Sequence, residues 1–97
     1  MFVKPDEIEW VQSADNYSEL HVGKTVHLLR QTLAALENQL PATKLVRISS
    51  SLMANVDCIK EIRPKSHGDY VVVLQDSTKL SASRNFRGGL LRLLGKA

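Results

Sequence analysis

Several residue types are scarce in this 97-residue chain, and each shortage excludes a class of protein. The one cysteine, Cys58, cannot form an internal disulfide, which favours a reducing compartment. Its neighbours Val56 and Ile59 are apolar, so we expect a buried and unreactive thiol. No apolar run approaches the roughly 20 residues that span a bilayer. No charged segment followed by an apolar one marks a secretory signal. We therefore expect a cytoplasmic protein.

The sequence also lacks the usual arrangements of catalytic and metal-binding residues. The histidines His21, His27 and His67 are scattered without metal-ligand spacing. A nucleophile in the run Ser49-Ser50-Ser51 would need a base oriented by a third group, and no Gly-x-Ser-x-Gly elbow is present. No glycine-rich loop is available for nucleotide phosphates. We expect a protein that is not an enzyme and that needs no cofactor or metal.

Acidic residues are missing from the C-terminal part of the chain. The formal net charge is +3, but residues 1–19 are acidic and the rest of the chain is strongly basic. After Asp76 the charged residues are Lys79, Arg84, Arg87, Arg92 and Lys96. A basic end suits a polyanionic partner. A solvated helix face is an equal alternative on charge alone.

The composition and the periodicity predict one folded domain over residues 1–97. Apolar residues make up 43% and charged residues 24%, which fits a soluble globular protein and argues against disorder. Runs with strand-forming residues, bounded by turn-formers, predict strands at 8–13, 17–22, 25–29, 45–48, 59–63, 70–74 and 79–82. The domain is therefore expected to be mainly β.

Two short helices are expected among these strands. Thr32 is a suitable N-cap for the first helix and Ser83 for the second. Pro41 ends the first helix, and Gly95 ends the second. The apolar residues at helical spacing are Leu33, Leu36 and Leu40 in the first helix, and Phe86, Leu90, Leu93 and Leu94 in the second.

Three blocks, at 8–17, 45–56 and 80–86, each read as a strand that runs into a polar turn. In the order and content of these blocks the chain resembles the LytTR family of bacterial DNA-binding domains. The resemblance covers essentially all of residues 2–94. The features that carry it are Trp10, Asn16-Tyr17 and His21 at the first block, and Leu80 and Ser83-Arg84 in the third.

The middle block keeps part of the family pattern and departs from the rest. The retained residues are Arg47, Ile48, Ser51, Met53 and Asn55. Ser49 stands where the family usually has histidine, Ser50 where it has a basic residue or asparagine, and Leu52 where it has an aromatic. These departures leave open whether the middle block contacts DNA.

The resemblance implies an elongated arrangement of short antiparallel sheets whose loops enter successive major grooves. It implies sequence-specific binding of duplex DNA by the output domain of a bacterial transcriptional regulator. Its partners would be repeated promoter sites, a second copy on the DNA, and an upstream receiver or membrane sensor domain. The usual first strand of the family would be trimmed here. The expected DNA-binding residues are Arg84, Ser50, Asn16, Tyr17, Ser18, Ser51 and Arg87.

Alternative roles remain open for several of these residues. The alternative for Arg84 is a side chain that contacts only solvent. The alternative for Asn16 is a turn position in the left-handed conformation, which asparagine tolerates. Arg47 and Asn55 favour a structural role in the irregular segment between strands. The aromatic residues expected in the core are Trp10, Phe2, Tyr70 and Phe86. Two other functions are a degenerate LytTR-like module for protein interaction or dimerisation with weak DNA binding, and an unrelated small β domain.

Overall fold

The computed structural model describes residues 3–93. Within them the chain forms eight strands and two α-helices. The strands are β1 (Trp10–Ala14), β2 (Tyr17–Val22), β3 (Thr25–Leu29), β4 (Leu45–Arg47), β5 (Leu52–Asn55), β6 (Ile59–Pro64), β7 (Tyr70–Leu74) and β8 (Lys79–Ala82). The helices are α1 (Leu33–Gln39) and α2 (Arg87–Leu93). Short 3-10 helices lie at Pro5–Glu7, Val56–Cys58, Ser66–Gly68 and Arg84–Phe86.

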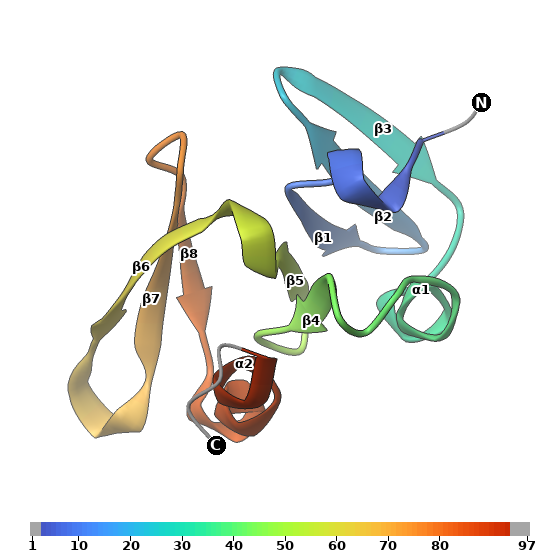
Figure 1. Cartoon of the computed structure of the whole chain (residues 1–97). Helices are drawn as coiled ribbons and strands as arrows, with labels where there is room; N and C mark the ends of the chain where they lie inside the picture. Colours follow the sequence, from blue (N-terminus) through green and yellow to red (C-terminus); the bar gives the residue numbers. More distant parts are fainter. Residues whose placement is uncertain (1–2, 94–97) are drawn as a thin grey trace.

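The strands form two separate antiparallel sheets that lie side by side (Figure 1). The larger sheet has the order β3-β2-β1-β5-β4, and the smaller sheet has the order β6-β7-β8. The molecule is elongated, with principal extents of 37 × 23 × 21 Å. The expected arrangement of short antiparallel sheets with two helices is therefore confirmed.

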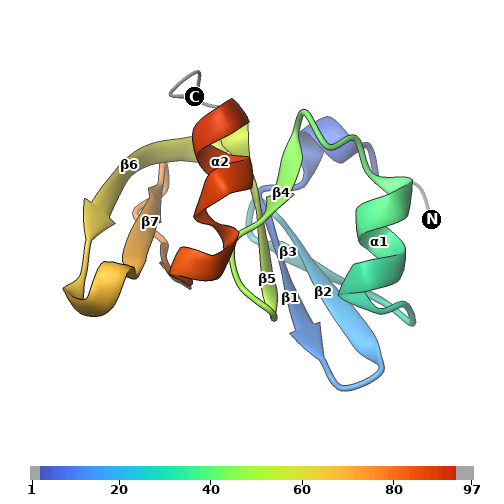
Figure 2. The ribbon, with the colours of Figure 1, turned by 90° about the horizontal axis from the view of Figure 1, so that it is seen from below.

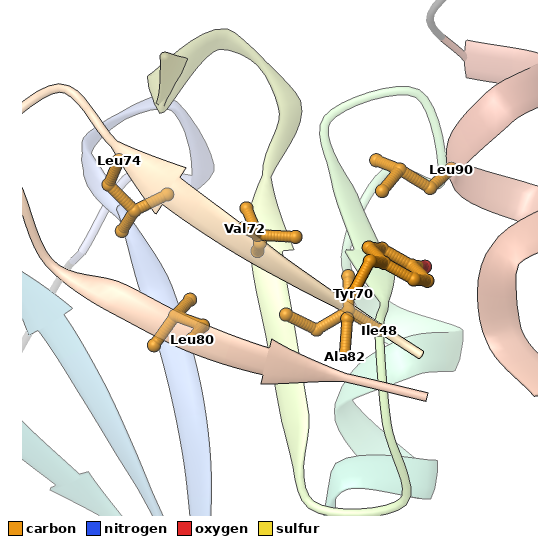
Figure 3. Packing of buried hydrophobic residues seen from close by; sticks show 8 residues of the cluster. Ile48, Tyr70, Val72, Leu74, Leu80, Ala82 and Leu90 are labelled. Carbon is orange, nitrogen blue, oxygen red and sulfur yellow. The ribbon is translucent and has the colours of Figure 1, made fainter. Parts of the chain in front are cut away.

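Two hydrophobic cores lie on opposite faces of the larger sheet. On one face, Val11 and Met53 pack against Leu36 of helix α1. On the other face, Ala54 packs in a cluster with residues of the smaller sheet and of α2. Figure 3 shows this second cluster, whose labelled members are Ile48, Tyr70, Val72, Leu74, Leu80, Ala82 and Leu90. Figure 2 shows α1 at one end of the molecule and α2 near the middle, between the smaller sheet and β4.

Strand β5 was not expected from the sequence, yet it lies between β1 and β4 in the larger sheet. Its residues do not alternate between buried and exposed, because both faces are covered. Met53 faces the α1 core, while Leu52 and Ala54 face the second core. A strand that is buried on both faces loses the period-two pattern by which a strand is recognised.

The other elements agree with the sequence prediction. All seven predicted strands are present, with some ends shifted by one or two residues. Thr32 caps α1, since its hydroxyl accepts a hydrogen bond from the Ala35 N–H at 3.1 Å. Ser83 caps the second helical segment, which begins as a 3-10 turn before it becomes α2. Phe2, Leu94, Gly95 and the side chain of Leu93 lie outside the described part of the structure.

Candidate nucleic-acid interface

Three predicted DNA-binding loops lie next to one another along one side of the molecule. They are the β1–β2 turn, the β4–β5 loop, and the segment that leads from β8 to Arg84. The Ser13 N–H donates to the Ser51 carbonyl at 2.9 Å, which joins the end of β1, just before the first loop, to the second. The Ser83 N–H donates to the Ile48 carbonyl at 2.8 Å, which joins the second to the third. Figure 2 shows this side at the bottom of the view.

The β4–β5 loop, which contains the three serines, is held in place by Arg47. Its Nε donates to the Ser49 carbonyl at 3.1 Å, and its Nη2 donates to the Ser50 carbonyl at 3.0 Å. The same guanidinium pairs with Glu37 of α1 at 3.1 Å and lies 5.4 Å from the centre of the Phe86 ring. The structural role predicted for Arg47 is confirmed. The Ser50 side chain itself is exposed.

Arg84 is exposed and is held against the loop between β6 and β7. Its backbone N–H donates to Asp69 Oδ1 at 3.1 Å, and its Nη1 donates to the His67 carbonyl at 3.1 Å. An added Cβ at Gly68, which has φ +83°, would lie 3.3 Å from the Arg84 Cδ. No acidic residue lies near Arg84 in the C-terminal part of the sequence, but the fold places the carboxylate of the distant Asp69 beside it. The contacts at Gly68 and His67 set the direction of the arginine side chain.

The β1–β2 turn exposes Asn16 and Tyr17 at the end of the larger sheet. Ala14 pairs with Tyr17, so Asp15 and Asn16 alone form the turn. The left-handed conformation was an alternative role for Asn16, but the residue that adopts it is Asp15, with φ 57°. Tyr17 is 43% exposed, which leaves its ring free for contact with a partner.

The prediction of a DNA contact from Ser18 is wrong. The residue has no exposed surface, and its hydroxyl donates to the Gln31 carbonyl at 2.7 Å. Ser18 lies on the face of β2 that also carries the buried Leu20, whereas Tyr17 lies on the opposite face. The period-two alternation of this strand is the sequence signal that places Ser18 on the same face as Leu20. Ser18 instead fixes the segment that precedes α1.

Comparison with known proteins finds a matching family over nearly the whole chain. The family model for the LytTr DNA-binding domain matches residues 1–95. The chain belongs to the LytTR family. Curated relatives of this LytTR domain include the Sensory transduction protein LytT of Bacillus cereus, at 27% identity over 97% of this chain. The LytT proteins of Bacillus subtilis and Enterococcus faecalis are 26% and 29% identical over 97% and 87% of this chain.

A solved structure has the same fold as this LytTR domain. It is the LytTr DNA-binding domain of a methyl-accepting/DNA response regulator from Bacillus cereus. The two superpose with a TM-score of 0.86 at 20% identity, over 96% of this chain and 85% of the other. The chain spans 38% of the length of the Bacillus cereus relative LytT.

A polar cleft of this LytTR domain adds two residues that the sequence analysis missed. The cleft measures about 300 Å³ and lies between the serine-containing loop and the end of β8. Its lining includes Ser50, Ser51, Ser83, Lys65 and Ser81. Lys65 lies outside the three blocks, and Ser81 lies inside the third but was not among the expected DNA-binding residues. Only the fold places both beside Ser50. Hydroxyl groups and an ammonium are common donors to DNA phosphates.

Other sequence features of this LytTR domain have the following positions in the structure. Cys58 is half-buried and not fully buried as expected. Burial is still the main factor that raises the pKa of its thiol, so little reactive thiolate forms near neutral pH. No group of three or more metal-ligating side chains occurs within residues 3–93. No helix in that part of the chain is long and apolar enough to cross a membrane.

Tyr70 is buried as predicted, whereas Trp10 is only half-buried and stacks on His21, with the ring centroids 3.7 Å apart.

Proposed function

We propose that this LytTR domain binds specific duplex DNA sequences through the major groove, as the output domain of a transcriptional regulator. The observation that carries the proposal is the hydrogen-bonded row of loops that presents Asn16, Ser50 and Arg84 on one side. These loops come from three distant parts of the chain and share an exposed polar surface. A receiver or sensor domain in the same protein, and a second copy on repeated promoter sites, belong to the proposal.

The proposed contacts divide by chemistry. Arg84 carries the planar fork that pairs with guanine, the commonest specific base contact made by arginine. Ser50, Ser51 and Lys65 line the polar cleft and donate to phosphate oxygens. Arg87 is exposed at the start of α2 and adds positive charge beside Arg84. Asn16 and Tyr17 contact the neighbouring groove from the β1–β2 turn.

Binding to duplex DNA should weaken steeply as salt rises. If about 3–6 phosphates are neutralised, a plot of log affinity against log salt should have a slope of about −3 to −5. Fluorescence anisotropy with the native upstream promoter region and a scrambled duplex, from low to moderate salt, measures this slope for both. Absence of binding to any duplex at low salt would contradict the proposal.

The variant Ser50→Arg should bind DNA more tightly and with less dependence on sequence. The Ser50 side chain is exposed, and the loop is held through its carbonyl group, so a longer side chain leaves the hydrogen bonds of Arg47 intact. One more neutralised phosphate should steepen the salt slope by about 0.9.

The matched control is Thr25→Arg, which adds the same charge at an exposed position at the far end of the β2–β3 hairpin. Equal gains from both variants would show that the position of the charge is irrelevant. Loss of binding in folded Ser50→Arg would show that the short side chain is required for fit.

A second candidate function is protein interaction or dimerisation, and one observation favours it. Tyr17, Val26 and Leu28 are 43%, 48% and 60% exposed. Val26 pairs with His21 and Leu28 pairs with Glu19, so all three apolar side chains lie on one face of the sheet. An affinity for duplex DNA that does not change with salt, together with self-association that is lost on Leu28→Ser, would favour this function over DNA binding.

A further inference from the structure

A second cleft lies on the other side of the loop that holds Arg84. It measures about 220 Å³ and lies between the β6–β7 end of the smaller sheet and α2. Its walls are largely apolar, with Ile62, Leu90 and Leu91 among them, and Lys65 and Arg87 supply positive charge. Of its lining residues, the proposed DNA contacts use Lys65 and Arg87, and they leave the apolar walls and Tyr70 unused.

The Tyr70 side chain gives the cleft a polar group without a partner. Tyr70 lines the cleft and is only 4% exposed, and its hydroxyl has no hydrogen-bond partner among residues 3–93. Figure 3 shows its ring pointing toward α2, next to Leu90. Burial raises the pKa of the Tyr70 hydroxyl, so the group stays protonated and available as a donor. A buried hydroxyl normally finds an acceptor, and its lack of one indicates that an acceptor belongs beside it.

The charges around the cleft favour an anion over a neutral or cationic ligand. Lys65, which follows β6, and Arg87, at the start of α2, are exposed cations in the lining. The carboxylate of Asp69, also in the lining, already accepts the backbone N–H of Arg84 at 3.1 Å. The lining therefore has a net positive charge and a donor at Tyr70, which together suit a carboxylate.

We propose that this cleft binds a small carboxylic acid with one compact apolar group. The apolar group would pack between Ile62 and Leu90, and the carboxylate would accept from Tyr70 beside Lys65 and Arg87. A cavity of about 150 Å³ holds benzene, so this cleft admits a single ring or short alkyl chain with its carboxylate.

The position of the cleft couples it to the DNA-binding side. Lys65 and Asp69 line both this cleft and the polar cleft beside the serine-containing loop. Arg84 donates to the His67 carbonyl of the same loop at 3.1 Å. An anion bound beside Lys65 and Arg87 would also neutralise charge that faces phosphate. The ligand should therefore weaken DNA binding, and this part of the inference rests on the proposed function.

The site is tested without DNA, by titrating the isotope-labelled chain with benzoate and following the amide resonances. Saturable shifts are expected at Gly68, Asp69, Tyr70 and Leu90. Acetate at equal ionic strength lacks the apolar group, and benzyl alcohol lacks the charge, so neither should reproduce them. Absence of saturable shifts, or equal shifts with either control compound, would overturn the site.

Three variants separate the contributions. Tyr70→Phe keeps the ring and removes only the hydroxyl, and should weaken benzoate binding about tenfold. Arg87→Gln should weaken it as well. Arg92→Gln removes the same charge from an exposed position on α2 outside the cleft, and should leave benzoate binding unchanged. Wild-type affinity in folded Tyr70→Phe would overturn the assignment of the hydroxyl.

The coupling is tested by DNA binding with and without saturating benzoate, with acetate as the control for ionic strength. We expect at least about a fivefold loss of DNA affinity, the lower end of usual coupling between sites. Unchanged DNA affinity with benzoate bound would overturn the coupling and leave the site in place. If the domain binds no duplex at all, the proposed function fails, and the titration without DNA still decides the site.

Discussion

Replacing Arg84 with alanine is expected to lower affinity for the specific DNA site by about 5–150-fold. A bidentate pair with guanine contributes about 1–3 kcal/mol of discrimination, at 1.4 kcal/mol per tenfold change. Affinity for scrambled duplex should fall much less. The melting temperature should barely move, because the side chain is exposed and its hydrogen bond within residues 3–93 is to the His67 carbonyl. Titration of both duplexes and a thermal melt measure these quantities.

Two comparison variants make the Arg84 result specific. Arg84→Lys keeps the charge but lacks the planar fork, so it should recover affinity for scrambled duplex and only part of the discrimination. Arg92→Gln removes an exposed charge from α2 and should lower affinity for both duplexes equally or not at all. Equal losses on specific and scrambled duplex for Arg84→Ala would show a phosphate contact in place of base reading.

Replacing Asn55 with alanine is expected to destabilise the domain by about 2–4 kcal/mol. Asn55 is 1% exposed at the end of β5. Its Nδ2 donates to the Ile8 carbonyl at 2.8 Å, and its Oδ1 accepts the Asp57 N–H at 2.9 Å. The change removes both bonds and leaves a carbonyl without this donor inside the protein. The melting temperature should fall by roughly 8–30 °C in a domain of this size.

The control for Asn55 is Asn38→Ala, an exposed position on α1. Alanine favours helix over asparagine, so this variant should match or slightly exceed the stability of the original chain. Urea unfolding of the three proteins gives the free energies. A loss below about 0.5 kcal/mol for Asn55→Ala, within the usual range for surface substitutions, would show that water replaces the amide and that the buried bonds contribute little.

Local sequence determined most of the secondary structure and the family. The strands β2, β3, β7 and β8 follow from runs of strand-forming residues bounded by turn-formers. Thr32 and Ser83 fix the helix starts because their hydroxyls reach backbone N–H groups within the same turn. These interactions span few residues, so the sequence alone specifies them.

Tertiary structure decided what depends on contacts between distant segments. Strand β5 has no readable pattern because its two faces pack into two different cores. Ser18 follows the motif turn in β2, and only the fold brings the distant Gln31 carbonyl beside its hydroxyl. Lys65 joins the proposed interface only because the β6–β7 loop lies beside the serine-containing loop. Burial and proximity depend on how the two sheets pack, which no local run of residues encodes.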